Sequence, residues 1–240
     1  MSYFIQTRSS FYSFLFTIPL FIIYEIGIIF LSKSDITVVR NGADFLMRVI
    51  LESFGIFGLY GLGAIFLIGF IVTYVFFIKG KNSSDIRTEY LFVMAFESVA
   101  WAILLYILLS KFMVLLMMPI GKAILQQVIL AVGAGIYEEF LFRVVLISGL
   151  SSIIGFVFLW QRKSSIITAL IIAAAIFSGF HFMGEYGDYF TMELFLLRFF
   201  AGVILGILYY ARGFGITAYA HSIYDLIVLI QITIRSPLQI

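Results

Sequence analysis

The sequence predicts an all-α, polytopic integral membrane protein that forms a bundle of seven or eight transmembrane helices. Of its 240 residues, 63% are hydrophobic and only 12% are charged, whereas a soluble domain averages about 45–50% apolar and about 25% charged residues. The apolar residues also form unbroken runs of about 20, the length at which a helix crosses a hydrocarbon core of about 30 Å. Because such runs are too long for the strands of a closed barrel, we expect every span to be helical.

Seven segments are candidate spans, and in chain order they are residues 11–31, 54–78, 90–109, 123–150, 165–182, 191–211 and 216–234. The first is longer than the apolar region of a signal peptide and has no small-residue cleavage site, so we expect it to be retained. Residues 151–160 either extend the fourth span past Gly149 or form a short helix of their own, and the choice between seven and eight helices depends on them. Residues 43–53 carry Asp44, Arg48 and Glu52 and are expected at the membrane interface.

Composition also limits the function classes. The chain has no cysteine, which removes disulfides, thiol catalysis and thiolate metal sites. Its net charge of +2 gives no argument for nucleic-acid binding. No soluble domain fits between the spans, so residues 1–240 are expected to form one membrane domain. The basic loops at residues 79–87 and 162–163 favour a cytoplasmic N-terminus, although further lysine and arginine residues then fall on the other side.

Several ionisable residues lie inside the predicted spans, where a charge costs at least about 2.5–3.5 kcal/mol on insertion scales. Glu25, Glu97 and Arg198 stand alone in sequence. The others fall on three different helices and include both histidines of the protein; they are Glu138, Glu139, Arg143, His181, His221 and Asp225. Each of these side chains needs a structural or functional reason for its position.

Helical spacing pairs some of these residues. Glu139 and Arg143 are four residues apart and share a face, whereas Glu138 is rotated by about 100° and needs another partner. His221 and Asp225 are also four apart, and a carboxylate beside an imidazole fixes its tautomer. Taken singly, each pair has a simpler interpretation as an ion pair or a hydrogen bond between helices. Taken together, three helices that each carry an acid or a base indicate a shared polar site.

The depths of these residues can be compared along their helices. The helices that hold Glu138 and His181 are joined by a turn at residues 161–163, and the two residues lie about 33 and about 27 Å from it at 1.5 Å per residue. Antiparallel packing would therefore bring them to a similar depth. His221 lies only about 12 Å from the turn at Arg212, so a tilt, a kink or a different number of spans is needed to bring it alongside them.

Three motifs occur in order on these helices: Glu-Glu-x-x-x-Arg at residues 138–143, Phe-x-x-x-His at residues 177–181 and His-x-x-x-Asp at residues 221–225. The pattern covers about residues 133–226 and resembles the CPBP family of CAAX-protease and bacteriocin-processing proteins, also called Abi proteins. These are intramembrane endopeptidases similar to the type II CAAX prenyl endopeptidase. The resemblance implies an integral protein of the inner or plasma membrane of a prokaryote, which hydrolyses a peptide bond of a membrane-associated protein or peptide.

The resemblance also implies a role for each motif residue. Glu138 would act as general base on a water that His181 helps to hold, and His221 with Asp225 would stabilise the oxyanion. Many relatives carry asparagine in place of Asp225, and an ionised aspartate is only an acceptor. We therefore assign Asp225 to the orientation of His221. The supporting residues, which would fix the site or grip the substrate backbone, are Glu139 and Arg143.

We expect no cofactor, and zinc is the alternative. Two histidines and a glutamate suit zinc, whose ligands would be Glu138, His181 and His221. The sequence lacks the His-Glu-x-x-His motif, which places two zinc ligands on one helix face. The expected partners are membrane lipids and the membrane-associated substrate, and not nucleic acid.

Two other functions also fit a polar site inside a membrane. A transporter or proton-coupled channel places carboxylates and histidines at mid-membrane, but it usually shows internal repeats, and none is evident in this sequence. The second alternative is a non-catalytic immunity scaffold on the same fold. The retention of every motif position argues against that alternative.

Overall fold

The computed structural model describes residues 3–30, 46–47, 61–79, 86–110, 124–183 and 187–235. Within these ranges the regular secondary structure is helical, without a strand. The predicted interfacial segment, residues 43–53, lies outside the described residues except for Leu46 and Met47. The all-α membrane architecture that the sequence predicts is confirmed.

Each predicted span overlaps a helix. In chain order the helices are α1 (Tyr3–Thr7), α2 (Ser10–Phe30), α5 (Gly61–Lys79), α6 (Glu89–Leu109), α7 (Ile124–Gly133), α8 (Ser148–Phe158), α9 (Arg162–Phe180), α10 (Met192–Arg212) and α11 (Phe214–Arg235). Two π-helical segments, η2 (Ala134–Glu138) and η3 (Phe140–Ile147), join α7 to α8 in one long helix, Ile124–Phe158. In the described part of the chain, five helices are long and apolar enough to cross a membrane: α2, α6, the long helix, α9 and α10.

Of residues 151–160, the first eight extend the fourth predicted span as a helix. The long helix continues past Gly149 to Phe158, and Leu159 ends it with a left-handed backbone conformation at φ 52°. Gln161 then has extended backbone angles, and α9 begins at Arg162. The alternative of a separate short helix over residues 151–160 is therefore wrong.

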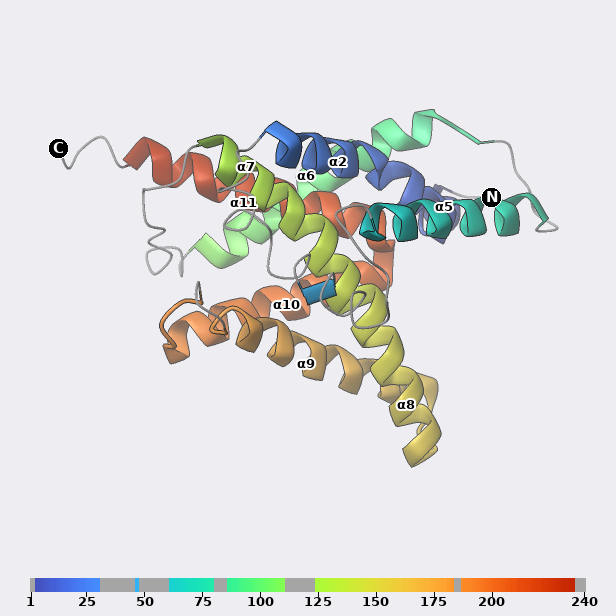
Figure 1. Ribbon diagram of the computed structural model, residues 1–240. Coiled ribbons are helices and arrows are strands. Elements are labelled where there is room, and N and C mark those ends of the chain that lie inside the picture. The colour runs from blue at the N-terminus through green and yellow to red at the C-terminus, as the bar shows by residue number, and fades with distance from the viewer. Residues whose placement is uncertain are drawn as a thin grey trace.

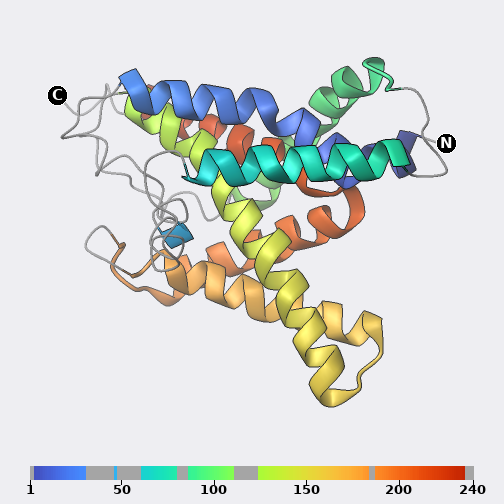
Figure 2. The ribbon, with the colours of Figure 1, turned by 45° about the vertical axis from the view of Figure 1, so that its right-hand side comes forward.

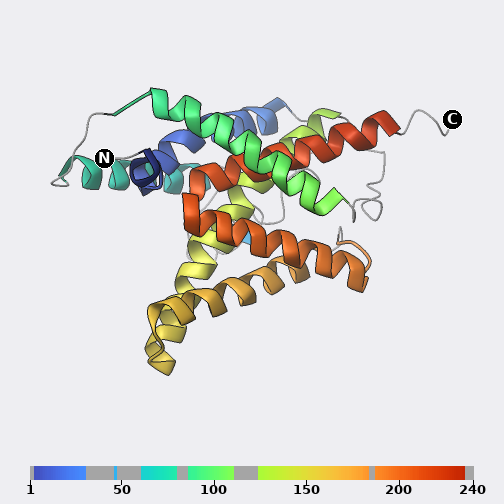
Figure 3. The ribbon, with the colours of Figure 1, turned by 180° about the vertical axis from the view of Figure 1, so that it is seen from behind.

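The helices form two groups that the long helix connects. In Figure 1, α2, α6, α7 and α11 lie together in an upper layer, and α5 runs along one side of that layer (Figure 2). Below it, α9 and α10 pack side by side, as the view from behind also shows (Figure 3). The long helix runs obliquely from the upper layer to the far end of α8, which packs on α9. Its middle part contacts both α9 and α11.

The long helix and α11 approach each other closely at Gly135. A Cβ atom at this position would lie 2.9 Å from the backbone nitrogen of Ser222 and would also meet the Ser222 hydroxyl and the carbonyl oxygen of Ala218. A side chain larger than hydrogen therefore does not fit without moving a helix backbone. The absence of a side chain at Gly135 lets the helical turn that follows it pack against α11.

Gly135→Ala is expected to destabilise the protein by about 1–3 kcal/mol, because the added methyl group overpacks a helix contact. The control is Gly149→Ala on the same helix, where a Cβ atom would meet nothing within 4 Å. This control should be neutral or stabilise by up to about 1 kcal/mol, since alanine favours a helix over glycine. Thermal unfolding in detergent compares the two variants, and equal stability would contradict the close packing at Gly135.

A buried ion pair ties the N-terminal residues to α6 and α10. Nε and Nη2 of Arg212 lie 2.5 and 2.8 Å from the two carboxylate oxygens of Glu97, and the Tyr3 hydroxyl donates to the same carboxylate at 2.7 Å. Arg212 also donates to the hydroxyl of Thr7 and to the backbone oxygen of Phe4. Burial and the hydrogen bond to Glu97 raise the pKa of Tyr3, so its phenol keeps the proton that it donates. Glu97, which stands alone in sequence, is thus paired with a residue 115 positions away.

Candidate active site

The acid pair lies at the junction of the two π-helical segments. Glu138 ends η2, and Glu139 separates it from η3. Both residues are buried, with 7% and 0% of their surface exposed. Single π-helical turns are frequent at functional sites. The sequence carries no signal for them, because its composition does not distinguish a π-helical turn from an α-helical one.

Glu139 bridges Arg143 and His221. Nε of Arg143 lies 3.0 Å from Oε2 of Glu139, and Nδ1 of His221 lies 2.7 Å from Oε1. The predicted Glu139–Arg143 pair is therefore present. Nε2 of His221 lies 3.5 Å from Oδ2 of Asp225, the predicted partner on the same helix. His221 is thus held between two carboxylates, and the hydrogen bond that orients its ring comes from Glu139 on the long helix.

His181 follows the last residue of α9 and faces Glu138. Its Nε2 atom is 3.9 Å from Oε2 of Glu138, and its Nδ1 atom is 2.9 Å from the backbone oxygen of Phe177. Because a carbonyl oxygen only accepts, Nδ1 carries the proton, and Nε2 of the neutral ring is an acceptor. The side chain of His181 is 27% exposed and that of Glu138 only 9%. The Glu138–His181 pair is therefore accessible from the side of the histidine.

Phe177 packs at the centre of the site. Its ring centroid lies 4.9 Å from that of His181 and 6.3 Å from that of His221. The Arg143 guanidinium lies 4.5 Å from the centroid of the same ring, within the range of a cation–π contact. Arg143 is 2% exposed, and among the described residues its two terminal nitrogens have no hydrogen-bond partner. This buried arginine can therefore still donate hydrogen bonds to a ligand.

A second ion pair lies beside His181. Arg198 on α10 pairs with Asp188, and the backbone nitrogen of Asp188 donates to the backbone oxygen of His181 at 3.0 Å. The guanidinium of Arg198 also lies over the ring of Phe182. Sequence reasoning missed this pair, because Arg198 stands alone in its span and Asp188 lies in a loop. The contact fixes the chain that leaves α9 at the histidine.

All six predicted site residues come together where the long helix meets α9 and α11. The contacts form two groups, one of Glu138 with His181, and a second one that joins Arg143, Glu139, His221 and Asp225. The adjacent glutamates link the two groups. A tilt was one way to bring His221 alongside Glu138 and His181, which lie further from the ends of their helices. The long helix has such a tilt, because it runs obliquely between the two groups of helices (Figure 1).

The alternative zinc ligands do not fit a metal ion in this arrangement. Nδ1 of His221 is bonded to Glu139, and Nε2 lies 3.5 Å from Asp225, so a zinc ion could take only Nε2 and would compete with that carboxylate for it. Among the residues that the structure describes, no group of three or more His, Cys, Asp and Glu side chains is placed to hold a metal ion.

Comparison with known proteins supports a functional assignment for this region. Residues 120–227 match the family described as type II CAAX prenyl endopeptidase Rce1-like. The matched range contains all six predicted site residues, and it confirms the resemblance that the three motifs indicate. No significant match to this chain was found among curated proteins or among solved structures.

Proposed function

We propose that the protein is an intramembrane endopeptidase in which Glu138 activates a water, because residues 120–227 match the Rce1-like family of type II CAAX prenyl endopeptidases. The substrate is a membrane-associated protein or peptide. The observation that carries the proposal is the position of Glu138, buried in the long helix and opposite Nε2 of His181.

A water between Glu138 and His181 would be held by two acceptors. The carboxylate of Glu138 accepts, and Nε2 of His181 accepts because Nδ1 is bonded to the Phe177 carbonyl. Their separation of 3.9 Å is too long for a direct hydrogen bond and suits a bridging water. Such a water donates both protons to the protein and turns an oxygen lone pair towards the substrate. Glu138 then takes a proton during the attack and passes it to the leaving amine.

The tetrahedral oxyanion would be stabilised by donors from the second group. Nδ1 of His221 is engaged by Glu139, so the ring can donate to an oxyanion only through Nε2, and only when it carries both protons. The carboxylates of Glu139 and Asp225 would balance that positive charge. The unpartnered terminal nitrogens of Arg143 are further donors, which can bind carbonyl oxygens of the substrate backbone.

The experiment that tests the proposal compares the termini of membrane proteins in cells that carry the wild-type protein or the Glu138→Gln variant. We expect at least one new terminus with the wild type that is missing with the variant. Glu89→Gln is the control, because Glu89 is exposed in the first turn of α6, and it should leave the termini unchanged. Identical termini in all three strains would contradict the proposal, and ion flux through liposomes that depends on Glu138 would then favour a transporter.

The proposed chemistry uses no metal or other cofactor. We therefore expect cleavage by the purified protein to persist after dialysis against a strong chelator, and elemental analysis of that preparation to find less than one equivalent of zinc. Loss of activity on chelation, with recovery on addition of zinc, would overturn the proposed glutamate mechanism and restore the alternative ligand set.

A further inference from the structure

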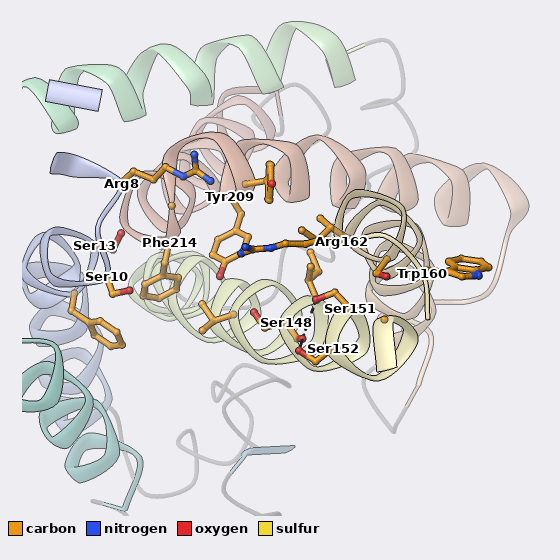
Figure 4. A pocket seen from close by; sticks show the side chains of 18 residues that line it. Arg8, Ser10, Ser13, Ser148, Ser151, Ser152, Trp160, Arg162, Tyr209 and Phe214 are labelled. Atoms are coloured by element: carbon orange, nitrogen blue, oxygen red, sulfur yellow. Dashed lines mark hydrogen bonds between the residues drawn. The ribbon is translucent and has the colours of Figure 1, made fainter. Parts of the chain in front are cut away.

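A cavity of about 690 Å³ lies apart from the acid pair. It is lined by the N-terminal end of α2, by η3 and α8, by the first turns of α9, and by the junction of α10 and α11 (Figure 4). His181 follows the opposite end of α9. It is about 27 Å along the helix from the turn at residues 161–163, at 1.5 Å per residue. The cavity is therefore at the end of several spans, where lipid headgroups meet the protein, and not at the site proposed for catalysis.

The charged residues in the lining of the cavity are all basic. Arg8 and Arg162 line it, and no aspartate or glutamate does. Arg8 lies over the ring of Tyr210, and among the described residues neither arginine forms an ion pair with a carboxylate. Figure 4 shows Arg162 reaching across the cavity towards Tyr209. Two cations that face one cavity without an acidic partner favour an anionic ligand, and arginine is suited to phosphate.

Hydroxyl groups supply further hydrogen bonds. Two tyrosines and six serines line the cavity: Tyr209, Tyr210, Ser10, Ser13, Ser148, Ser151, Ser152 and Ser165. Ser148, Ser151 and Ser152 are three and four residues apart and share one face of α8 (Figure 4). The hydroxyls of Ser151 and Ser152 donate to the backbone oxygen of Ser148 at 3.0 and 2.8 Å. Because a hydroxyl rotates, each of them can instead donate to a ligand oxygen.

The cavity also has apolar lining residues. They are Phe14, Val144, Ile147, Ile166 and Phe214. At the rim stands Trp160, which is 47% exposed and belongs to a residue type that is enriched at the membrane–water interface. A cavity lined by cations, hydroxyls and apolar side chains together matches an amphiphile. A free phosphate ion would leave the apolar lining residues and most of the volume unused.

We propose that this cavity binds the phosphodiester headgroup of an anionic phospholipid, with Arg8 and Arg162 on the phosphate and the first part of an acyl chain on the apolar lining residues. A lipid headgroup and a free phosphate ion would present the same phosphate group to the two arginines. Because the cavity lies at the ends of the spans, the proposed ligand is the lipid. This inference does not depend on the proposed peptidase activity.

The test measures lipid binding to the purified full-length protein by native mass spectrometry. The ligands are phosphatidylglycerol, phosphatidylcholine and inorganic phosphate. We expect saturable binding of phosphatidylglycerol that is at least about tenfold weaker in the double variant Arg8→Gln, Arg162→Gln, because each arginine contributes a charge-assisted hydrogen bond. Lys163→Gln is the matched control, since Lys163 is exposed next to Arg162 but does not line the cavity, and it should bind like the wild type.

Ser152→Phe provides an independent variant that keeps both arginines and fills the cavity. We expect it to weaken phosphatidylglycerol binding as well, which separates a shaped site from a general attraction of basic residues for anionic lipid. Circular dichroism shows whether each variant remains helical. Equal binding of phosphatidylcholine and phosphatidylglycerol, or wild-type binding by both cavity variants, would overturn the proposal. Binding of inorganic phosphate without binding of lipid would also overturn it.

Discussion

Glu138→Gln is expected to lower the rate of peptide-bond cleavage by about 10²–10⁴-fold, the usual contribution of a general base. Glutamine has nearly the shape of glutamate and can still bind the water, but its amide cannot take the proton. The rate is measured with purified protein in liposomes, on a substrate that the comparison of membrane-protein termini identifies. Melting temperature and gel-filtration profile establish that the variant remains folded.

The isosteric change at Glu89 is the control for the loss of one carboxylate. Glu89 is exposed at the start of α6 and lies outside the matched region, so its variant should retain the wild-type rate. Wild-type cleavage by a well-folded Glu138→Gln protein would exclude Glu138 as the base. The same family assignment would then need another residue to activate the water.

Glu139→Ala is expected to destabilise the protein by about 3–5 kcal/mol, the usual cost of removing one partner of a buried ion pair. Glu139 is fully buried and contacts both Arg143 and His221, so its loss leaves a buried guanidinium without its counter-ion. Unfolding of the purified protein in detergent, followed by circular dichroism, measures the change. A loss below about 1 kcal/mol, typical of an exposed pair, would contradict the bridging role of Glu139.

Two comparisons make this prediction specific. Asp188→Ala removes the carboxylate of an ion pair whose Asp188 side chain is 53% exposed, and it should cost at most about 1 kcal/mol. The double variant Glu139→Leu, Arg143→Met removes both charges of the buried pair. Its loss of unfolding free energy should be smaller than the sum of the losses in the two single variants. The reason is that neither position then leaves a buried charge without its partner.

The positions of the helices were predictable because they follow from the lengths of the apolar runs. The predicted spans overlap the observed helices, and Glu139 pairs with Arg143 because both are on one helix, four residues apart. The contact of Glu139 with His221 joins residues 82 positions apart and depends on how the helices cross. Helical periodicity contains no information about that crossing.

Local backbone geometry accounts for the other differences. The two π-helical segments carry no composition signal, and the close approach at Gly135 depends on which residues of α11 face the long helix. The four-residue spacing of His221 and Asp225 on one helix predicted that Asp225 orients the ring of His221. In the structure the shorter contact is made by Glu139 from another helix, at 2.7 Å compared with 3.5 Å for Asp225.

The ion pair between Glu97 and Arg212 has a consequence for the biogenesis of the protein. A ribosome completes α6 more than a hundred residues before it reaches Arg212, which lies 115 positions later. During that interval the carboxylate of Glu97 has to enter the translocon or the bilayer without the guanidinium that neutralises it in the folded protein. The early intermediate therefore carries an insertion cost of about 2.5–3.5 kcal/mol if Glu97 is ionised at the centre of the helix, and this cost is relieved only when α10 has been inserted beside α6.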